Sequence, residues 1–76
     1  MTTPDARLDI TRDLCPMTFV KTKLALEDLS PGQVLEVHLR QGEPLNNVTR
    51  SVTEDGHAVL EKTEFSPGIW RLLIRN

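Results

Sequence analysis

The 76-residue chain lacks several features that mark larger or more specialised proteins. Its single cysteine excludes a disulfide within the chain, and with only two histidines it is poorly equipped for the four ligands of a structural zinc site. No apolar run exceeds three residues, so no segment could span a membrane as a helix. With one Trp, two Phe and no Tyr, the thin core of so small a domain has little aromatic bulk, and we expect Trp70 to contribute to it.

The charge balance is mildly acidic. Nine Lys and Arg face eleven Asp and Glu, which gives a net charge of −2 with no basic block. Nucleic-acid-binding domains carry a concentrated positive surface, so this balance argues against direct nucleic-acid binding. Residues 1–5 are polar and lack the apolar stretch of a signal peptide. We therefore expect a cytoplasmic protein with one domain over residues 1–76, of which 1–6 are flexible.

Glycine and proline divide the chain into short segments that predict a β-α-β-α-β-β order. Alternating apolar residues predict strands over 7–11, 34–40, 57–65 and 69–75, with a tight turn at Ser66-Pro67-Gly68. A helix is expected over 17–29, and a second follows a loop over 41–44, capped by Asn46 or Asn47 and closed by Gly56. This order predicts an α+β fold, a two-layer α/β sandwich with two helices on one face of a four-stranded mixed sheet. Parallel pairing is expected across each helical crossover.

The first predicted helix has two apolar stripes at helical spacing. A helix on a sheet needs only one such stripe, so the second must meet another helix or a partner protein. Helix–helix packing is the simpler interpretation, whereas exposure would make the second stripe a partner surface beside Cys15. The first stripe holds Phe19, Thr22, Ala25, Leu26 and Leu29, and the second holds Met17, Val20 and Leu24.

Cys15 is the only residue that resembles a reactive centre. A free thiol with a pKa of about 8.5 is mostly protonated at neutral pH, but the N-terminus of a helix favours the thiolate. Pro16 suits the first helical position, which would place Cys15 at the N-cap, and Arg12 and Lys21 could add positive charge. No histidine or carboxylate is spaced to serve as its base, so the pattern favours transfer between sulfur atoms over hydrolysis. The plainer alternative is an inert buried thiol.

Two other groups of residues have simpler interpretations. We expect His38 to lie on the polar face of a strand and His57 in a turn. Glu43-Pro44 predicts a turn before it suggests a binding loop. None of these residues indicates a metal site or a bound cofactor.

Taken in order along the chain, a set of residues resembles the TusA/SirA/YedF family of small sulfur-carrier proteins. The resemblance covers nearly the whole chain from about residue 7, and it depends on the combined order because Cys-Pro alone is common. The matching residues are Leu8-Asp9, Cys15-Pro16, Lys21-Thr22-Lys23, Ala25-Leu26, Gly32, Leu35-Glu36-Val37, Pro44, Gly56-His57, Val59-Leu60 and Leu73-Ile74-Arg75.

The resemblance implies a TusA-like sandwich whose cysteine accepts sulfane sulfur as a persulfide and passes it to a partner. Carried onto this chain, Cys15 is the persulfide site and Pro16 its helix-starting neighbour. The family's donors include cysteine desulfurases and rhodanese-like proteins. Its acceptors include DsrE-like relay proteins that feed tRNA thiolation and other sulfur pathways. No cofactor or metal is implied.

The chain also departs from the family pattern around its cysteine. The family has Cys-Pro-x-Pro, whereas Thr18 stands at the second proline and supplies an N–H that could donate to the sulfur. The loop before the cysteine also differs, so we expect Arg12, Asp13, Met17 and Lys21 to contribute to partner docking. The alternative function is a non-catalytic interaction or regulatory domain that retains the fold. A redox-sensing thiol would need a second cysteine, which only a second copy of the chain could supply.

Overall fold

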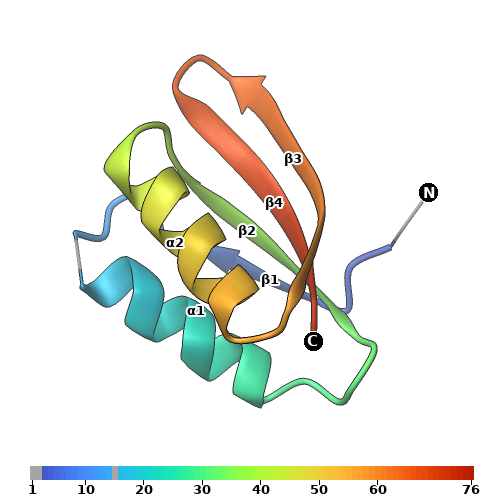
Figure 1. Cartoon of the computed structure of the whole chain (residues 1–76). Helices are drawn as coiled ribbons and strands as arrows, with labels where there is room; N and C mark the ends of the chain where they lie inside the picture. Colours follow the sequence, from blue (N-terminus) through green and yellow to red (C-terminus); the bar gives the residue numbers. More distant parts are fainter. Residues whose placement is uncertain (1–2, 15) are drawn as a thin grey trace.

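The computed structural model describes residues 3–14 and 16–76, and its elements follow the predicted β-α-β-α-β-β order (Figure 1). The strand over 34–40 and the final strand begin and end where the alternation of apolar residues placed them. The first and third strands shift by one or two residues. The elements are β1 (Ala6–Asp9), α1 (Met17–Glu27), β2 (Val34–Arg40), α2 (Glu43–Glu54), β3 (Ala58–Ser66) and β4 (Ile69–Arg75).

The four strands form one mixed sheet in the order β1-β2-β4-β3. β1 pairs with β2 in parallel, whereas β4 is antiparallel to both of its neighbours. The predicted parallel pairing across the second crossover is wrong, because β4 lies between β2 and β3. Burial accounts for this order, since β4 buries Leu72, Leu73 and Ile74 on its two faces while most residues of β3 are exposed. A strand that is apolar on both faces belongs inside a sheet, and a polar one at its edge.

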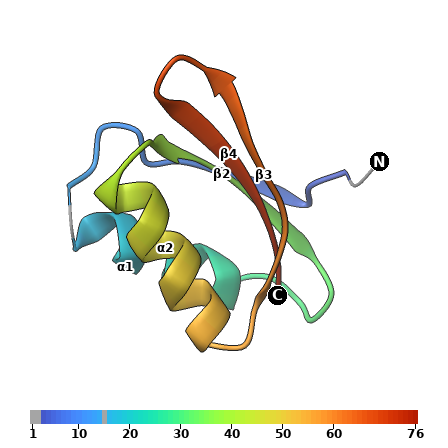
Figure 2. The same ribbon diagram turned by 45° about the horizontal axis from the view of Figure 1, so that its top comes forward.

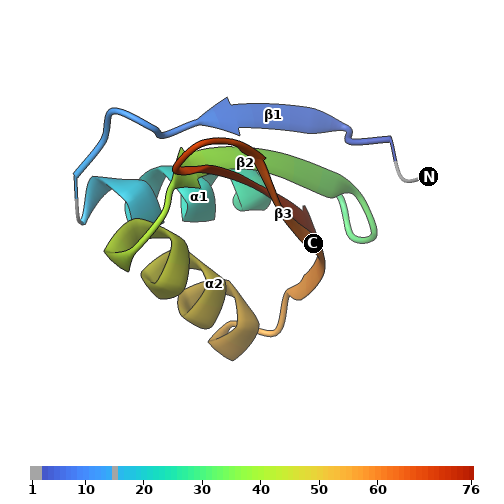
Figure 3. The same cartoon turned by 90° about the horizontal axis from the view of Figure 1, so that it is seen from above.

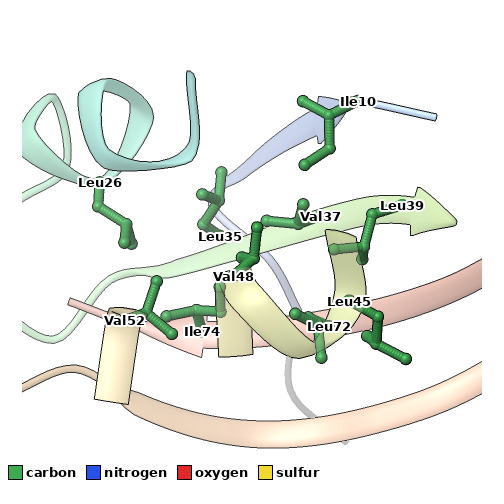
Figure 4. Packing of buried hydrophobic residues seen from close by; sticks show 10 residues of the cluster. All are labelled: Ile10, Leu26, Leu35, Val37, Leu39, Leu45, Val48, Val52, Leu72 and Ile74. Atoms are coloured by element: carbon green, nitrogen blue, oxygen red, sulfur yellow. The ribbon is translucent and has the colours of Figure 1, made fainter. Parts of the chain in front are cut away.

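Both helices cover the same face of the sheet, as expected (Figure 3). Side chains from α1, α2, β2 and β4 meet between the two layers (Figure 4), together with Ile10, which lies just after β1. Trp70 packs at the margin of this core, half-buried, with its indole Nε1 donating to Gln41 Oε1 at 3.2 Å. The cluster consists of Ile10, Leu26, Leu35, Val37, Leu39, Leu45, Val48, Val52, Leu72 and Ile74.

α2 begins three residues before the expected cap. Its N-cap is Gly42, whose φ of 99° and ψ of −139° lie in a region that is essentially restricted to glycine. Glu43 and Pro44, expected in a loop, form the first turn, where proline is tolerated because its missing N–H would have no helical partner. The prediction of an asparagine cap is therefore wrong, since Asn46 already donates its backbone N–H to the carbonyl of Gly42 at 3.0 Å.

The C-terminal ends of both helices are closed by identifiable hydrogen bonds. After α2, the N–H of Gly56 donates to Thr53 O at 3.1 Å and that of His57 donates to Val52 O at 2.9 Å. This pair is the Schellman motif, which confirms Gly56 as the stop and uses its φ of 90°. After α1, the side-chain amide of Asn76 donates to the carbonyls of Leu26 and Leu29 at 2.9 and 2.6 Å. Asn76, which directly follows β4, thus ties the sheet to the end of α1 and to the residue after its C-cap.

The face of the sheet away from the helices holds a buried carboxylate, that of Glu36. Its side chain is 8% exposed, and its oxygens lie 2.8 Å from His38 Nε2 and 3.5 Å from both Arg7 Nε and Arg71 Nη1. Arg71 also pairs with Glu61 on β3. His38 therefore lies on the sheet face, as expected, and is part of an ion-pair network that joins all four strands.

Candidate functional site

The candidate site is the connection between β1 and α1, which carries Cys15. The N-cap of α1 is Pro16, so the predicted place of Cys15 at the N-cap is wrong. Cys15 itself lies outside the described residues. Both neighbours are described and both are exposed, Leu14 to 81% of its maximum. A partner protein can therefore approach the chain on either side of this position.

The connection starts from a well-ordered end of β1. The buried Ile10 donates its N–H to the carbonyl of His38 on β2 at 2.9 Å. The next residue, Thr11, donates its hydroxyl and its backbone N–H to Asp9 Oδ1 at 2.7 and 2.9 Å. These two hydrogen bonds lower the pKa of Asp9, the hydroxyl more than the N–H. Desolvation raises this pKa slightly, and the charges of His38 and Arg12 lower it further. The turn that leaves the strand is fixed by its own side chains.

Two cations from outside the connection hold its middle. Arg40, the last residue of β2, donates from Nε to the carbonyl oxygen of Thr11 at 2.6 Å. Lys21 on α1 donates from Nζ to Asp13 Oδ1 at 2.9 Å. The two contacts tie successive parts of the connection to the sheet and to the helix.

α1 begins at Met17 as predicted and ends two residues early at Glu27, but its cap lies one residue later than predicted. Pro16 is the N-cap, with φ −90° and ψ 5°, and the helix itself begins at Met17. Val20 donates its N–H to the carbonyl of Pro16 at 3.0 Å, and Thr18 donates its own to Leu14 O at 3.4 Å. Thr18 is fully buried, so it is part of the packing under the helix and does not belong to an exposed docking surface.

An exposed apolar stripe continues from the connection along α1, and we call its four residues, Leu14, Met17, Val20 and Leu24, the α1 stripe. Their exposed fractions are 81, 45, 36 and 56%. The prediction that Met17, Val20 and Leu24 pack against another helix is wrong, because the residues of α1 that face the core are Thr18, Thr22 and Leu26. Contiguous exposed apolar residues commonly mark interaction sites.

The start of α2 lies close to the connection (Figure 2). A surface hollow of about 310 Å³ lies beside the connection. It brings together Arg12 and Asp13, two of the expected docking residues, while Lys21 joins them through its ion pair with Asp13 and Met17 lies on the α1 stripe. The lining residues are Thr11, Arg12, Asp13, Leu14, Arg40 and Pro44.

Our sequence reasoning missed Arg40 at this site. A signal for it existed, because parallel strands end at the same edge of a sheet and their following residues become neighbours. The register pairs Asp9 with His38, which brings Thr11 level with Arg40. Sequence separation concealed this contact, because the two residues lie 29 positions apart.

In the described part of the chain we looked for groups of metal ligands and for membrane-spanning helices. Among residues 3–14 and 16–76, no three His, Asp or Glu side chains come together as metal ligands. Within the same residues, neither helix is long and apolar enough to cross a bilayer. The described surface beside residue 15 consists of guanidinium, carboxylate and exposed apolar groups, which suit contact with another protein.

The fold and site together define a small two-layer α/β domain with one cysteine on an exposed connection and an open apolar helix face next to it. Comparison with known proteins assigns the family. The family described as sulfurtransferase TusA matches residues 6–76, and the chain belongs to it. The match confirms the resemblance drawn from the residues.

Individual relatives agree with this assignment. A protein of Archaeoglobus fulgidus, named for a proposed sulfur-carrier role, is 38% identical over 68 residues, which cover 90% of this chain and 77% of the relative. YedF of Escherichia coli, named in the same way, is 33% identical over 70 residues, covering 92 and 91%. The crystal structure of a SirA-like protein from Desulfitobacterium hafniense superposes with a TM-score of 0.81 at 22% identity, covering 92% of this chain and 95% of that chain, and so supports the fold. The relatives support a sulfur-carrier role in general terms.

Proposed function

We propose that this protein accepts sulfane sulfur as a persulfide on Cys15 and passes it to a cysteine of a partner protein. The observation that carries the proposal is the family match over residues 6–76 in a chain whose only cysteine lies between two exposed residues. Another protein can reach both of these neighbours without the fold opening.

The chemistry consists of two exchanges that balance without an external oxidant. In the first, the Cys15 thiolate attacks the terminal sulfur of a donor persulfide. A new S–S bond forms, the S–S bond of the donor breaks, and the donor leaves as a thiolate with the electron pair. In the second, an acceptor thiolate attacks the terminal sulfur on Cys15, and Cys15 leaves as the thiolate. Each exchange needs a thiolate, which positive charge near the sulfur favours.

The partners are proteins, and the α1 stripe is where we propose that they dock. Its apolar residues lead directly to residue 15, and two exposed cations lie close to them in the chain, Arg12 two residues before Leu14 and Lys21 directly after Val20. We expect donors of the cysteine desulfurase or rhodanese-like type and acceptors of the DsrE-like type, acting in the cytoplasm in pathways such as tRNA thiolation. An apolar patch bordered by cations matches a partner surface that is apolar with an acidic rim.

Intact-protein mass spectrometry tests the chemistry. After incubation with a cysteine desulfurase and cysteine, the protein should gain about 32 Da, one sulfur atom, that a reductant removes. Cys15→Ser should show no gain. A Cys15→Ser protein that still takes up reducible sulfur would disprove the proposal.

The docking surface is tested with a pair of matched leucines. Leu24 on the α1 stripe is 56% exposed and Leu60, on β3, is 42% exposed. Leu24→Ser should slow sulfur transfer from the desulfurase by about fivefold or more, since a central apolar contact is lost, while Leu60→Ser should leave the rate unchanged. Equal rates in the two variants would place docking elsewhere.

The alternative is an interaction domain that retains the fold without the chemistry. It is motivated by Thr18, which stands in place of the family's second proline and is buried beneath α1. This alternative predicts no mass gain with any donor and slow alkylation of Cys15. It also predicts that Cys15→Ser binds partners as well as the natural chain does.

A further inference from the structure

Arg40 is the one residue of β2 that makes a side-chain hydrogen bond to the backbone of the Cys15 connection, among the contacts of the described residues. Its Nε donates to the carbonyl oxygen of Thr11 at 2.6 Å. A carbonyl in an exposed turn could equally well be hydrated, so this bond selects one arrangement of the connection without being required for folding.

The same side chain lines the hollow that reaches Leu14, the residue directly before Cys15. Within this hollow the charged side chains are those of Arg12, Asp13 and Arg40, and Lys21 on α1 offsets Asp13 at 2.9 Å. The carboxylate of Asp9 at the start of the connection is offset by the charge of Arg12. With both carboxylates offset, the guanidinium of Arg40 leaves the described surroundings of the connection positive. Arginine keeps its charge over the whole range in which a thiol titrates.

We propose that Arg40 is a positioning residue for Cys15. It holds the connection through the Thr11 carbonyl and thereby keeps a permanent positive charge on the connection that carries the cysteine, which favours the thiolate needed for sulfur exchange. This inference rests on the proposed function only for its purpose, because the effect on the thiol can be measured without any sulfur donor.

The test follows the alkylation rate of Cys15 with iodoacetamide as a function of pH in four proteins. These are the natural chain, Arg40→Gln, Arg40→Lys and Arg75→Gln. Arg75 is the matched control, since it is an exposed arginine on the same face of the sheet but pairs with Val34 at the opposite end of β2. Removing its charge alters the net charge equally but leaves the connection untouched.

We expect Arg40→Gln to shift the alkylation midpoint to higher pH and to slow alkylation at neutral pH about three- to tenfold, the effect of one partly exposed charge on a neighbouring group. Arg40→Lys should restore most of the rate, because lysine keeps both the charge and a donor for the Thr11 carbonyl. Arg75→Gln should follow the natural chain. Unfolding in urea, measured in parallel, should show equal stability for the two glutamine variants.

Two results overturn the proposal. One is an Arg40→Gln midpoint equal to that of Arg75→Gln, and the other is an Arg40→Lys protein that is no better than Arg40→Gln. The proposed function fails separately. If the natural chain takes up no sulfur while Arg40→Gln still raises the midpoint, the persulfide role is wrong and the positioning role stands.

Discussion

Two leucines of α1, two positions apart, should lose very different amounts of stability when each is truncated to alanine. Leu26 is 1% exposed and packs against the sheet, whereas Leu24 is 56% exposed on the α1 stripe. Leu26→Ala removes buried methyl groups and leaves a cavity, which costs about 2–5 kcal/mol. Leu24 buries less than half of its surface, so Leu24→Ala should cost about 0.5–1 kcal/mol, partly offset by the better helix propensity of alanine.

The expected difference is large compared with the stability of so small a domain. At typical values per residue the free energy of unfolding is about 4–11 kcal/mol. Leu26→Ala should therefore remove about a fifth of it or more, and in the least stable case it abolishes cooperative unfolding. Leu24→Ala should keep the unfolding transition nearly in place and lose only the efficiency of transfer from a sulfur donor.

Urea unfolding followed by the fluorescence of Trp70, the single tryptophan, measures both variants. A domain of this size has a slope near about 1 kcal/mol per molar urea, so the midpoints of the two variants should differ by more than about 1 M. A loss above about 2 kcal/mol for Leu24→Ala would refute the reasoning, because it would mean that the α1 stripe is packed as well.

Three further changes probe the ends of the elements and the open sheet face. Glu36→Gln should cost about 1–2 kcal/mol in urea unfolding, because a buried carboxylate with three basic neighbours loses its charge while the most exposed of them contributes little; a variant as stable as the natural chain would contradict this. Asp9→Ala should destabilise the protein at neutral pH and progressively less below about pH 4. The sign follows from the lowered pKa of Asp9, whose bonds to Thr11 stabilise the fold above the unfolded-state pKa and are lost as the pH falls through the folded one; unfolding at both pH values checks it, and an unchanged difference would refute it. Gly56→Ala should cost about 1 kcal/mol in thermal or urea unfolding, because its φ of 90° strains any side chain although nothing lies within 4 Å of the added Cβ; a cost above about 3 kcal/mol would indicate a clash.

Local patterns in the sequence identified most of the elements. The strands over 34–40 and 69–75 carry an apolar residue at every second position, on one face, and this period requires no knowledge of their neighbours. The stop at Gly56 is equally local, because a left-handed residue after a helix favours glycine. The start of α2 was misjudged because Asn46 has the chemistry of a cap, and only the conformation of Gly42 shows that the helix has already begun.

The candidate site divides in the same way. Short stretches of sequence were enough to predict Cys15, Arg12 and Lys21 as site residues, because a candidate thiol and its neighbouring charges lie within a few residues of one another. The contact of Arg40 with Thr11 cannot, because it depends on the parallel register of β1 and β2. The exposure of Leu24 also depended on where α2 and the sheet lie.

The sequence by itself determined the order of the elements, the family and the choice of Cys15 as the candidate reactive residue, since each follows from the types of residues and their order along the chain. Only the tertiary structure decided that β4 lies between β2 and β3, that the α1 stripe faces outward, and that Arg40 reaches the Cys15 connection. The helix propensity of a segment is similar whether its apolar face is covered or exposed, and the strand propensity is similar for an inner and an edge strand. The choice between them comes from how much apolar surface the whole chain can bury at once.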